Sequence, residues 1–227
     1  MVTDAIGPPG AEGRRGFLAA AVTLPVLLIS VAARSQANPG LWFDPAQLPS
    51  YSGRLERLVL NPAGEIDRLL YREGAQILFP ASEAQEIVEA VRPGDSMTVW
   101  GIRARSAPAI TMLAWARAQG QRPHFVAQPS WFAPTRRGTQ RIAMAGIIDR
   151  TLLTPQGEGM GVLLQSGDVI RLAPNVHLAV ADLLRDGASI AAEGLGQRQA
   201  ERSAIDAERI GPDPGHLQAL PAATPRP

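Results

Sequence analysis

The chain has 227 residues, of which 45% are hydrophobic, and this length and composition fit a globular protein with one large or two small domains. It contains no cysteine, which excludes disulfide frameworks, thiolate metal sites and cysteine nucleophiles. All 22 basic residues are arginine and 21 residues are acidic, so the composition does not indicate nucleic-acid binding.

The N-terminal part of the chain has the three-part layout of an export signal. Residues 13–37 read GRRGFLAAAVTLPVLLISVAARSQA, in which paired arginines precede an apolar run and small residues then surround a cleavage position. We predict that residues 1–37 are an export signal removed near Ala37. The mature protein is then expected in the periplasm.

The arginine pair gives this signal a more specific character. Arg14 and Arg15, followed by Gly-Phe-Leu, resemble the twin-arginine type of signal, although Gly13 stands where that type usually has Ser or Thr. The resemblance implies transport of an already folded protein. A retained membrane anchor is the alternative, but the apolar run has only 17 residues with Pro25 in its middle, which is short for a bilayer span.

A long internal repeat follows. Residues 53–101 recur as residues 146–194, shifted by 93 positions without a net gap, and 13 of the 49 aligned positions are identical. Chance would give roughly four. The unit is too long for a solenoid repeat, so each copy is expected to be a small domain. The constant register is typical of strands, in which a one-residue slip would turn every side chain to the opposite face.

The best-matched stretch of the repeat predicts a hairpin turn. LNPAGE at residues 60–65 returns as LTPQGE at residues 153–158. Pro at the second turn position has its φ preset, and Gly at the fourth position supplies the left-handed residue of a bulged hairpin. We expect each stretch to join the first strand of its copy to the second.

Each copy is predicted to contain three strands, a short helix and two further strands. The expected strands are 54–60, 65–72, 76–79, 97–102 and 110–116 in the first copy, and 147–153, 158–165, 169–172, 189–193 and 203–210 in the second. The helix of the first copy is expected to start with a capping box from Ser82 to Gln85. The helix of the second copy is expected to start with Asn175 as its N-cap.

This order of elements resembles the OB fold, a five-stranded Greek-key barrel with its helix between the third and fourth strands. The predicted fold is therefore all-β with one short helix per repeat, as two tandem OB-like five-stranded barrels at residues 53–119 and 141–211. Leu48-Pro49, the Pro-x-Gly-Glu turn and Gly94-Asp95 are also similar to motifs of bacterial exported proteins of unknown function with two tandem OB-like domains. The second copy departs from that pattern at Gly187-Ala188.

Three further segments lie around the two copies. We predict a Pro-rich arm at residues 38–52, a linker at residues 120–140 and a disordered tail at residues 212–227. The linker carries Trp131 and Phe132, and apolar aromatic residues of this kind either pin a linker onto a neighbouring domain or bind a partner.

OB folds commonly bind single-stranded nucleic acid or oligosaccharide through the face of their second and third strands. The second copy has no Phe, Tyr or Trp, and in both copies the acidic residues outnumber the arginines, so such binding rests on fold analogy alone. The candidate partner contacts are instead Tyr71 and Trp100 of the first copy, together with Trp131 and Phe132.

Motifs for catalysis or cofactor binding are weak. His124, His177 and His216 are scattered without the spacing of metal ligands. The glycine-rich stretch at residues 157–161 falls in a predicted hairpin, whereas a dinucleotide motif needs a strand-to-helix turn. We therefore expect no catalytic residue, metal or cofactor.

Glu65 and Glu158 are the only duplicated carboxylates with a possible chemical role. If the two turns face each other, these side chains could hold a cation, because hard cations prefer clustered oxygens. The alternative is that each is a solvated turn residue paired with the duplicated Arg57 or Arg150 on the preceding strand.

The sequence thus predicts an exported, non-enzymatic binding or protein-interaction module. Its partner is expected to be another envelope protein or an unidentified ligand, with membrane contact only if the signal segment is retained. A structural envelope component without a ligand is the alternative from a different functional class.

Overall fold

The computed structural model describes residues 47–117, 120–129 and 138–221. The predicted signal and the residues Trp131 and Phe132 lie outside the described residues. Strands make up 51% of the structure and helices 14%, and both copies of the repeat belong to one compact unit, Gln36–Pro227. Among the described helices, none is both long and apolar enough to cross a membrane.

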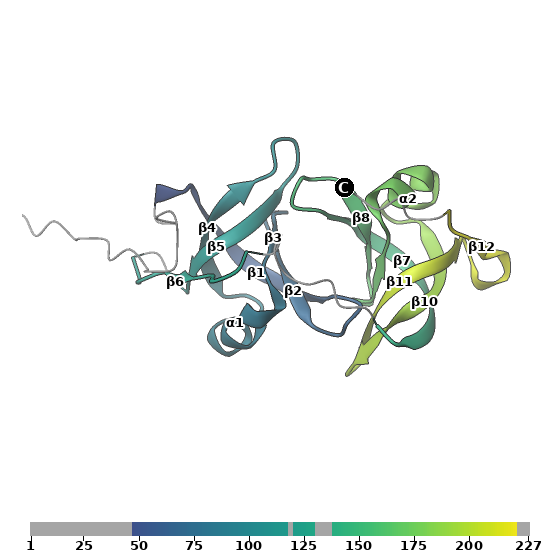
Figure 1. Ribbon diagram of the computed structural model, residues 1–227, viewed down its shortest axis with the longest axis horizontal. Coiled ribbons are helices and arrows are strands. Elements are labelled where there is room, and N and C mark those ends of the chain that lie inside the picture. Colours follow the sequence, from purple (N-terminus) through teal and green to yellow (C-terminus); the bar gives the residue numbers. More distant parts are fainter. Residues whose placement is uncertain (1–46, 118–119, 130–137, 222–227) are drawn as a thin grey trace, which may run out of the picture. The chain divides into compact units, whose positions relative to one another are not determined.

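The first copy forms a closed five-stranded barrel (Figure 1). Its elements are β1 (Ser50–Leu60), β2 (Ile66–Tyr71), β3 (Gln76–Leu78), the 3-10 turn η2 (Ala81–Glu83), α1 (Ala84–Ala90), β4 (Ser96–Arg103) and β5 (Ala109–Ala116). The antiparallel pairs are β1 with β2 and β4, β2 with β3, and β4 with β5. The parallel pair of β3 and β5 closes the barrel.

The second copy repeats this topology, which confirms the predicted OB-like barrels. Its elements are β7 (Gln140–Leu153), β8 (Gly159–Leu164), β9 (Val169–Arg171), α2 (Pro174–Ala179), the 3-10 turn η4 (Ala181–Leu183), β10 (Ser189–Gln199) and β11 (Arg202–Gly211). Here β7 pairs with β8 and β10, β8 with β9, β10 with β11, and the parallel pair of β9 and β11 closes the barrel.

The two hairpin turns form as predicted. Gly64 has φ +81° and Gly157 has φ +90°, so both need the left-handed conformation that glycine adopts without strain. Each glycine amide donates a hydrogen bond of 2.9 Å across its turn, to the carbonyl of Asn61 or Thr154. The repeated Pro and Gly are therefore explained by backbone geometry.

A second pair of repeated glycines marks a bulge that both barrels share. The register shifts between Trp100 and Gly101 in β4, and between Glu193 and Gly194 in β10. A Cβ atom on Gly101 would lie 2.0 Å from the carbonyl oxygen of the facing strand, and a Cβ on Gly194 would lie equally close. Only glycine lets the two backbones approach so closely.

Each barrel also carries a short sixth strand that the sequence did not predict. The strand β6 (His124–Phe125) pairs antiparallel with β5, and β12 (Gln218–Ala219), which follows the 3-10 turn η5 (Pro214–His216), pairs antiparallel with β11. β6 lies within the predicted linker at residues 120–140, and β12 lies within the predicted tail at residues 212–227. Their few residues carry too little periodic pattern to reveal a strand.

The sixth strands are equivalent members of the repeat. In the parallel pairs, Ala109 of β5 lies beside Gln76, and Ala204 of β11 lies beside Val169, so Ala109 and Ala204 are equivalent. At the matching places on β5 and β11, Val126 donates to the carbonyl of Leu113 at 3.0 Å and Leu220 to that of Glu208 at 2.9 Å. The structural repeat is thus a six-stranded unit, longer than the sequence alignment.

In the first copy, the first strand and the helix start at other residues than predicted. β1 begins at Ser50, inside the predicted arm at residues 38–52. Ser82 lies within η2, which follows Pro80, and α1 starts after Glu83 without a side-chain cap. The intervening 3-10 turn explains why no capping box forms.

The predicted N-cap of the second helix is wrong for a related reason. Pro174 occupies the first helical position, which its fixed φ favours, and Ala173 is the N-cap. Asn175 therefore lies inside α2.

Each barrel has its own hydrophobic core. The core of the first contains aromatic residues, with Tyr71, Phe79 and Trp115 all at most 6% exposed. The core of the second is aliphatic, built from residues such as Ile148, Leu164 and Ile190, all at most 1% exposed.

Candidate functional site

The faces through which OB folds bind their ligands are covered by the other copy. Buried side chains from both barrels form a single cluster: Val59, Leu60, Leu70, Leu152, Leu163, Val169 and Ala204. Leu70 lies on β2 and Leu163 at the equivalent place on β8, and both have no exposed surface. The strand faces that could bind an oligonucleotide or a glycan therefore take part in packing between the copies.

The two repeated hairpins make reciprocal contacts across this boundary. Leu60, at the end of β1, belongs to the cluster that contains Ala204 of the second barrel. Leu153, at the end of β7, packs with Leu78 and Ala109 of the first barrel. Since Ala109 and Ala204 are equivalent, each copy gives the other the same contact.

The turns themselves lie against the opposite copy. A Cβ atom on Gly64 would lie 3.1 Å from the Cβ of Gln197 in β10. A Cβ on Gly157 would lie 2.7 Å from the Cβ of Ala107, in the loop between β4 and β5. In OB folds these turns and loops flank the ligand face, so here they too are used internally.

Gln76 supplies the main hydrogen bonds between the copies. Its side chain, only 4% exposed as a residue, donates from Nε2 to the carbonyl of Thr151 at 2.7 Å. Its Oε1 accepts from the backbone amide of Leu153 at 3.1 Å and from Nη1 of Arg68 at 2.5 Å. In the other direction, Arg202 donates to the carbonyl of Leu58 at 3.2 Å.

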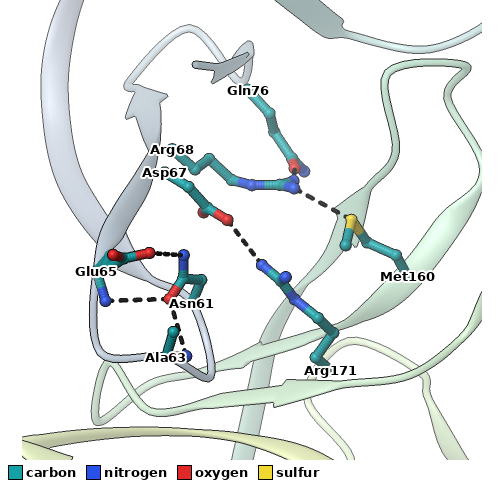
Figure 2. A network of polar contacts seen from close by, with 8 residues as sticks. All are labelled: Asn61, Ala63, Glu65, Asp67, Arg68, Gln76, Met160 and Arg171. Carbon is teal, nitrogen blue, oxygen red and sulfur yellow. Dashed lines mark hydrogen bonds and ion pairs between the residues drawn. The ribbon is translucent and has the colours of Figure 1, made fainter. Parts of the chain in front are cut away.

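Figure 2 shows the charged part of this boundary, where Arg68 of the first copy and Arg171 of the second each contact a residue of the opposite copy. Arg171 donates to Asp67 at 2.9 Å, and the second nitrogen of the Arg68 guanidinium contacts the sulfur of Met160 at 3.2 Å. Burial lowers the pKa of Arg68 to about 10, so the group remains charged at neutral pH. Arg68 is buried, whereas the side chains of Arg171 and Asp67 keep 19% and 22% of their surface exposed, so this ion pair is only partly shielded from solvent.

A further ion pair joins the first strands of the two copies. Arg150 binds both carboxylate oxygens of Glu56, at 2.9 and 3.2 Å, and also binds its neighbour Asp149 at 3.0 Å. The sequence suggested Glu158 as the partner of Arg150. Glu56 lies on β1, and Asp149 and Arg150 lie on β7, so the cluster links these two strands through side chains.

Both residues of the predicted carboxylate pair lie in hydrogen-bonded turns. The Asn61 side chain donates to Glu65 at 3.5 Å and accepts from the backbone amides of Ala63 and Glu65 (Figure 2). The backbone amide of Glu158 donates to the Thr154 hydroxyl at 3.1 Å. Within the described ranges, no three His, Asp or Glu side chains are placed to hold a metal ion.

The predicted aromatic contacts Tyr71 and Trp100 differ in burial. Tyr71 is 1% exposed, donates its hydroxyl to the carbonyl of Met97 at 3.2 Å, and has its phenol pKa raised by burial. It is a core residue with almost no surface open to a partner. Trp100 is half-buried on β4, between Ser50 and Ala114 of the adjacent strands, and its role stays a prediction.

The second barrel has an open groove of about 640 Å³ that the sequence did not predict. It lies beside the part of β11 between Asp206, the last residue paired with β9, and Arg209, the first residue paired with β12. Its lining is mostly apolar, with three charged residues: Met160, Arg171, Leu172, Ala173, Pro174, Val176, Leu195, Asp206, Ala207, Glu208, Leu220 and Pro221.

The repeat explains why there is space at this place. Ala207 and Leu172 line the groove, whereas the equivalent residues of the first copy are Met112 and Phe79. Both of these larger side chains are at most 1% exposed and fill the first barrel. Aligning the two copies through their fifth strands would have revealed this loss of side-chain volume from sequence.

Comparison with known proteins adds no relative to this picture. No family model, curated protein or solved structure matches the chain.

Proposed function

We propose that this protein is a non-enzymatic binding module that engages its partner through the groove of the second barrel. The observation that carries the proposal is the covering of both OB ligand faces by packing between the copies. A surface buried in this way is not accessible to a ligand, whereas the groove remains open. An apolar concavity with a few polar groups is the usual form of a binding site.

The lining indicates the chemistry of the partner. Nine of the twelve lining residues are apolar, and Arg171, Asp206 and Glu208 supply the polar groups. This combination suits an apolar segment of another protein with polar groups at its ends. If residues 1–37 are the export signal that the sequence predicts, another envelope protein is the expected partner and the periplasm the expected compartment.

The test fills the groove with the residues that the first copy uses. In the double variant L172F/A207M, the second barrel takes the equivalent side chains of the first, so the fold has a precedent for them. The exported wild-type protein is isolated under native conditions and its bound species are identified by mass spectrometry. The variant is expected to lose a species that the wild type retains.

A matched control adds an aromatic ring next to the groove without filling it. Leu178 lies on α2, is 77% exposed and is not part of the lining, so L178F should retain the bound species. Equal retention by L172F/A207M and wild type would contradict the proposal.

The alternative is a structural envelope component that needs no ligand. The covered ligand faces favour it, because two barrels that bury these faces in each other have given up the usual OB function. Isolation of a stoichiometric large assembly that also forms with L172F/A207M would support this alternative.

A further inference from the structure

His124 lies between two carboxylates at the start of the connection between the copies. Its Nε2 is 3.0 Å from Oε2 of Glu83 in η2, and its Nδ1 is 3.1 Å from Oε2 of Glu86 in α1. Both ring nitrogens therefore approach a carboxylate oxygen at hydrogen-bond distance.

The two contacts constrain the protonation state of the imidazole ring. A neutral imidazole has one N–H and one lone pair, whereas the protonated ring has two N–H donors. With two ionised carboxylates, both contacts are attractive only if the ring carries two protons, because a lone pair would otherwise face an oxygen. The three side chains together thus fit best when the ring is an imidazolium.

The surroundings restrict this site without closing it. Glu83 is 8% exposed, and burial raises its pKa while the neighbouring His124 opposes that rise. The charged groups facing the ring are Glu83 and Glu86, and from β5 the ring meets the indole of Trp115 at a centroid distance of 5.3 Å. The His124 side chain is 39% exposed, so protons exchange with solvent.

The second copy has no equivalent of this cluster. At the positions of Glu83, Glu86 and His124 it carries Val176, Ala179 and Gln218, although β12 pairs with β11 as β6 pairs with β5. The sixth strand can therefore form without a His–Glu cluster, and in the second copy the Arg209 guanidinium donates instead to the carbonyl of Leu217, just before β12, at 3.0 Å. The ion pairs of the first copy depend on the charges of His124, Glu83 and Glu86, whereas the backbone pairing of β6 does not.

We propose that His124, Glu83 and Glu86 form a proton-dependent latch, which fastens the connection between the copies onto the first barrel. The latch is closed when the imidazole is protonated and weakens when the imidazole is neutral. Since both contacts are attractive when the ring carries two protons and the carboxylates are ionised, the latch is expected to hold β6 more firmly at lower pH than at higher pH. It also weakens at acidic pH once Glu83 takes up a proton, which burial makes easier than for an ordinary glutamate.

The backbone amide of Val126 reports on the latch. This amide donates to the carbonyl of Leu113 at 3.0 Å and directly follows β6. Its hydrogen-exchange protection factor, which removes the intrinsic pH dependence of exchange, is measured by NMR on the full chain between about pH 5 and about pH 8. The protection factor is expected to fall about fivefold or more over this range.

The matched control is H124Q, which gives the first copy the residue of the second. Its Val126 protection factor should be low and independent of pH, and E86Q should reduce the dependence by removing one carboxylate. A pH-independent protection factor in the wild type would overturn the proposal. The same pH dependence in H124Q would also overturn it, because another group, such as His177 or His216, would then be responsible.

Discussion

The two barrels have the same backbone and different interiors. They share their strand pairing, the bulge at Gly101 and Gly194, and a sixth strand on the outside of the fifth. Where the first barrel has Phe79 and Trp115, the second has aliphatic residues, among them Leu172. The second barrel has an open groove at the place where the first barrel contains the buried side chains of Met112 and Phe79.

This difference separates what the fold requires from what each copy is free to change. The repeated glycines and prolines serve turns and close backbone approaches, which tolerate few substitutions. Side-chain volume can change as long as the core remains apolar. The groove and the latch of His124 both lie at positions where the copies differ, so they are the places to expect separate roles.

The largest expected effect compares two adjacent leucines of β8. Leu163 packs between the copies and Leu164 packs inside its own barrel, and neither has exposed surface. We expect L163A and L164A each to lower the free energy of unfolding by about 3 kcal/mol, because both create cavities. The measurement is denaturant unfolding of the full chain.

The comparison of L163A with L164A tests the packing of the copies, because a second barrel that did not pack against the first would expose Leu163 but not Leu164. If the second barrel does not pack against the first, L163A would resemble a surface substitution and cost less than about 0.5 kcal/mol. L164A would still cost its full amount, so it controls for the quality of the measurement.

A smaller effect is expected from exchanging a residue between the copies. Val169 stands in the second copy where the first has Gln76. Q76V should cost about 2 kcal/mol, because the amide of Leu153 and the guanidinium of Arg68 lose a buried acceptor. Thermal or denaturant unfolding measures this loss.

The control for Q76V is Q85A on the surface of α1. Gln85 is exposed and its side chain donates to Glu89 one turn away, so its loss should cost less than about 0.5 kcal/mol. Equal effects of the two substitutions would mean that Gln76 does not join the barrels.

Much of the fold could be predicted from sequence because its signals are local. The hairpin turns follow from Pro and Gly at fixed positions, and the constant repeat register follows from strand pairing. The helix starts were missed because Pro80 and Pro174 determine where the turns begin, and a capping pattern centred on Ser82 or Asn175 does not include that effect.

The sites could not be predicted in the same way because they depend on contacts between distant residues. Tyr71 is of a residue type that is common in binding sites, but its side chain points into the core because side chains alternate between the two faces of β2. His124 meets Glu83 only because β6 returns to the first barrel. The duplicated LNPAGE-type turns were correctly interpreted as hairpins, yet their use as contacts between copies requires the tertiary structure.

The central claim is that the two OB ligand faces are packed against each other, and a double-mutant cycle tests it most directly. Leu70 and Leu163 are equivalent residues in the cluster shared by both copies. The free energies of unfolding of wild type, L70A, L163A and the double variant give their coupling. We predict a coupling energy of about 1 kcal/mol or more, as for residues in contact. Additivity within about 0.3 kcal/mol would contradict the packing of the two faces.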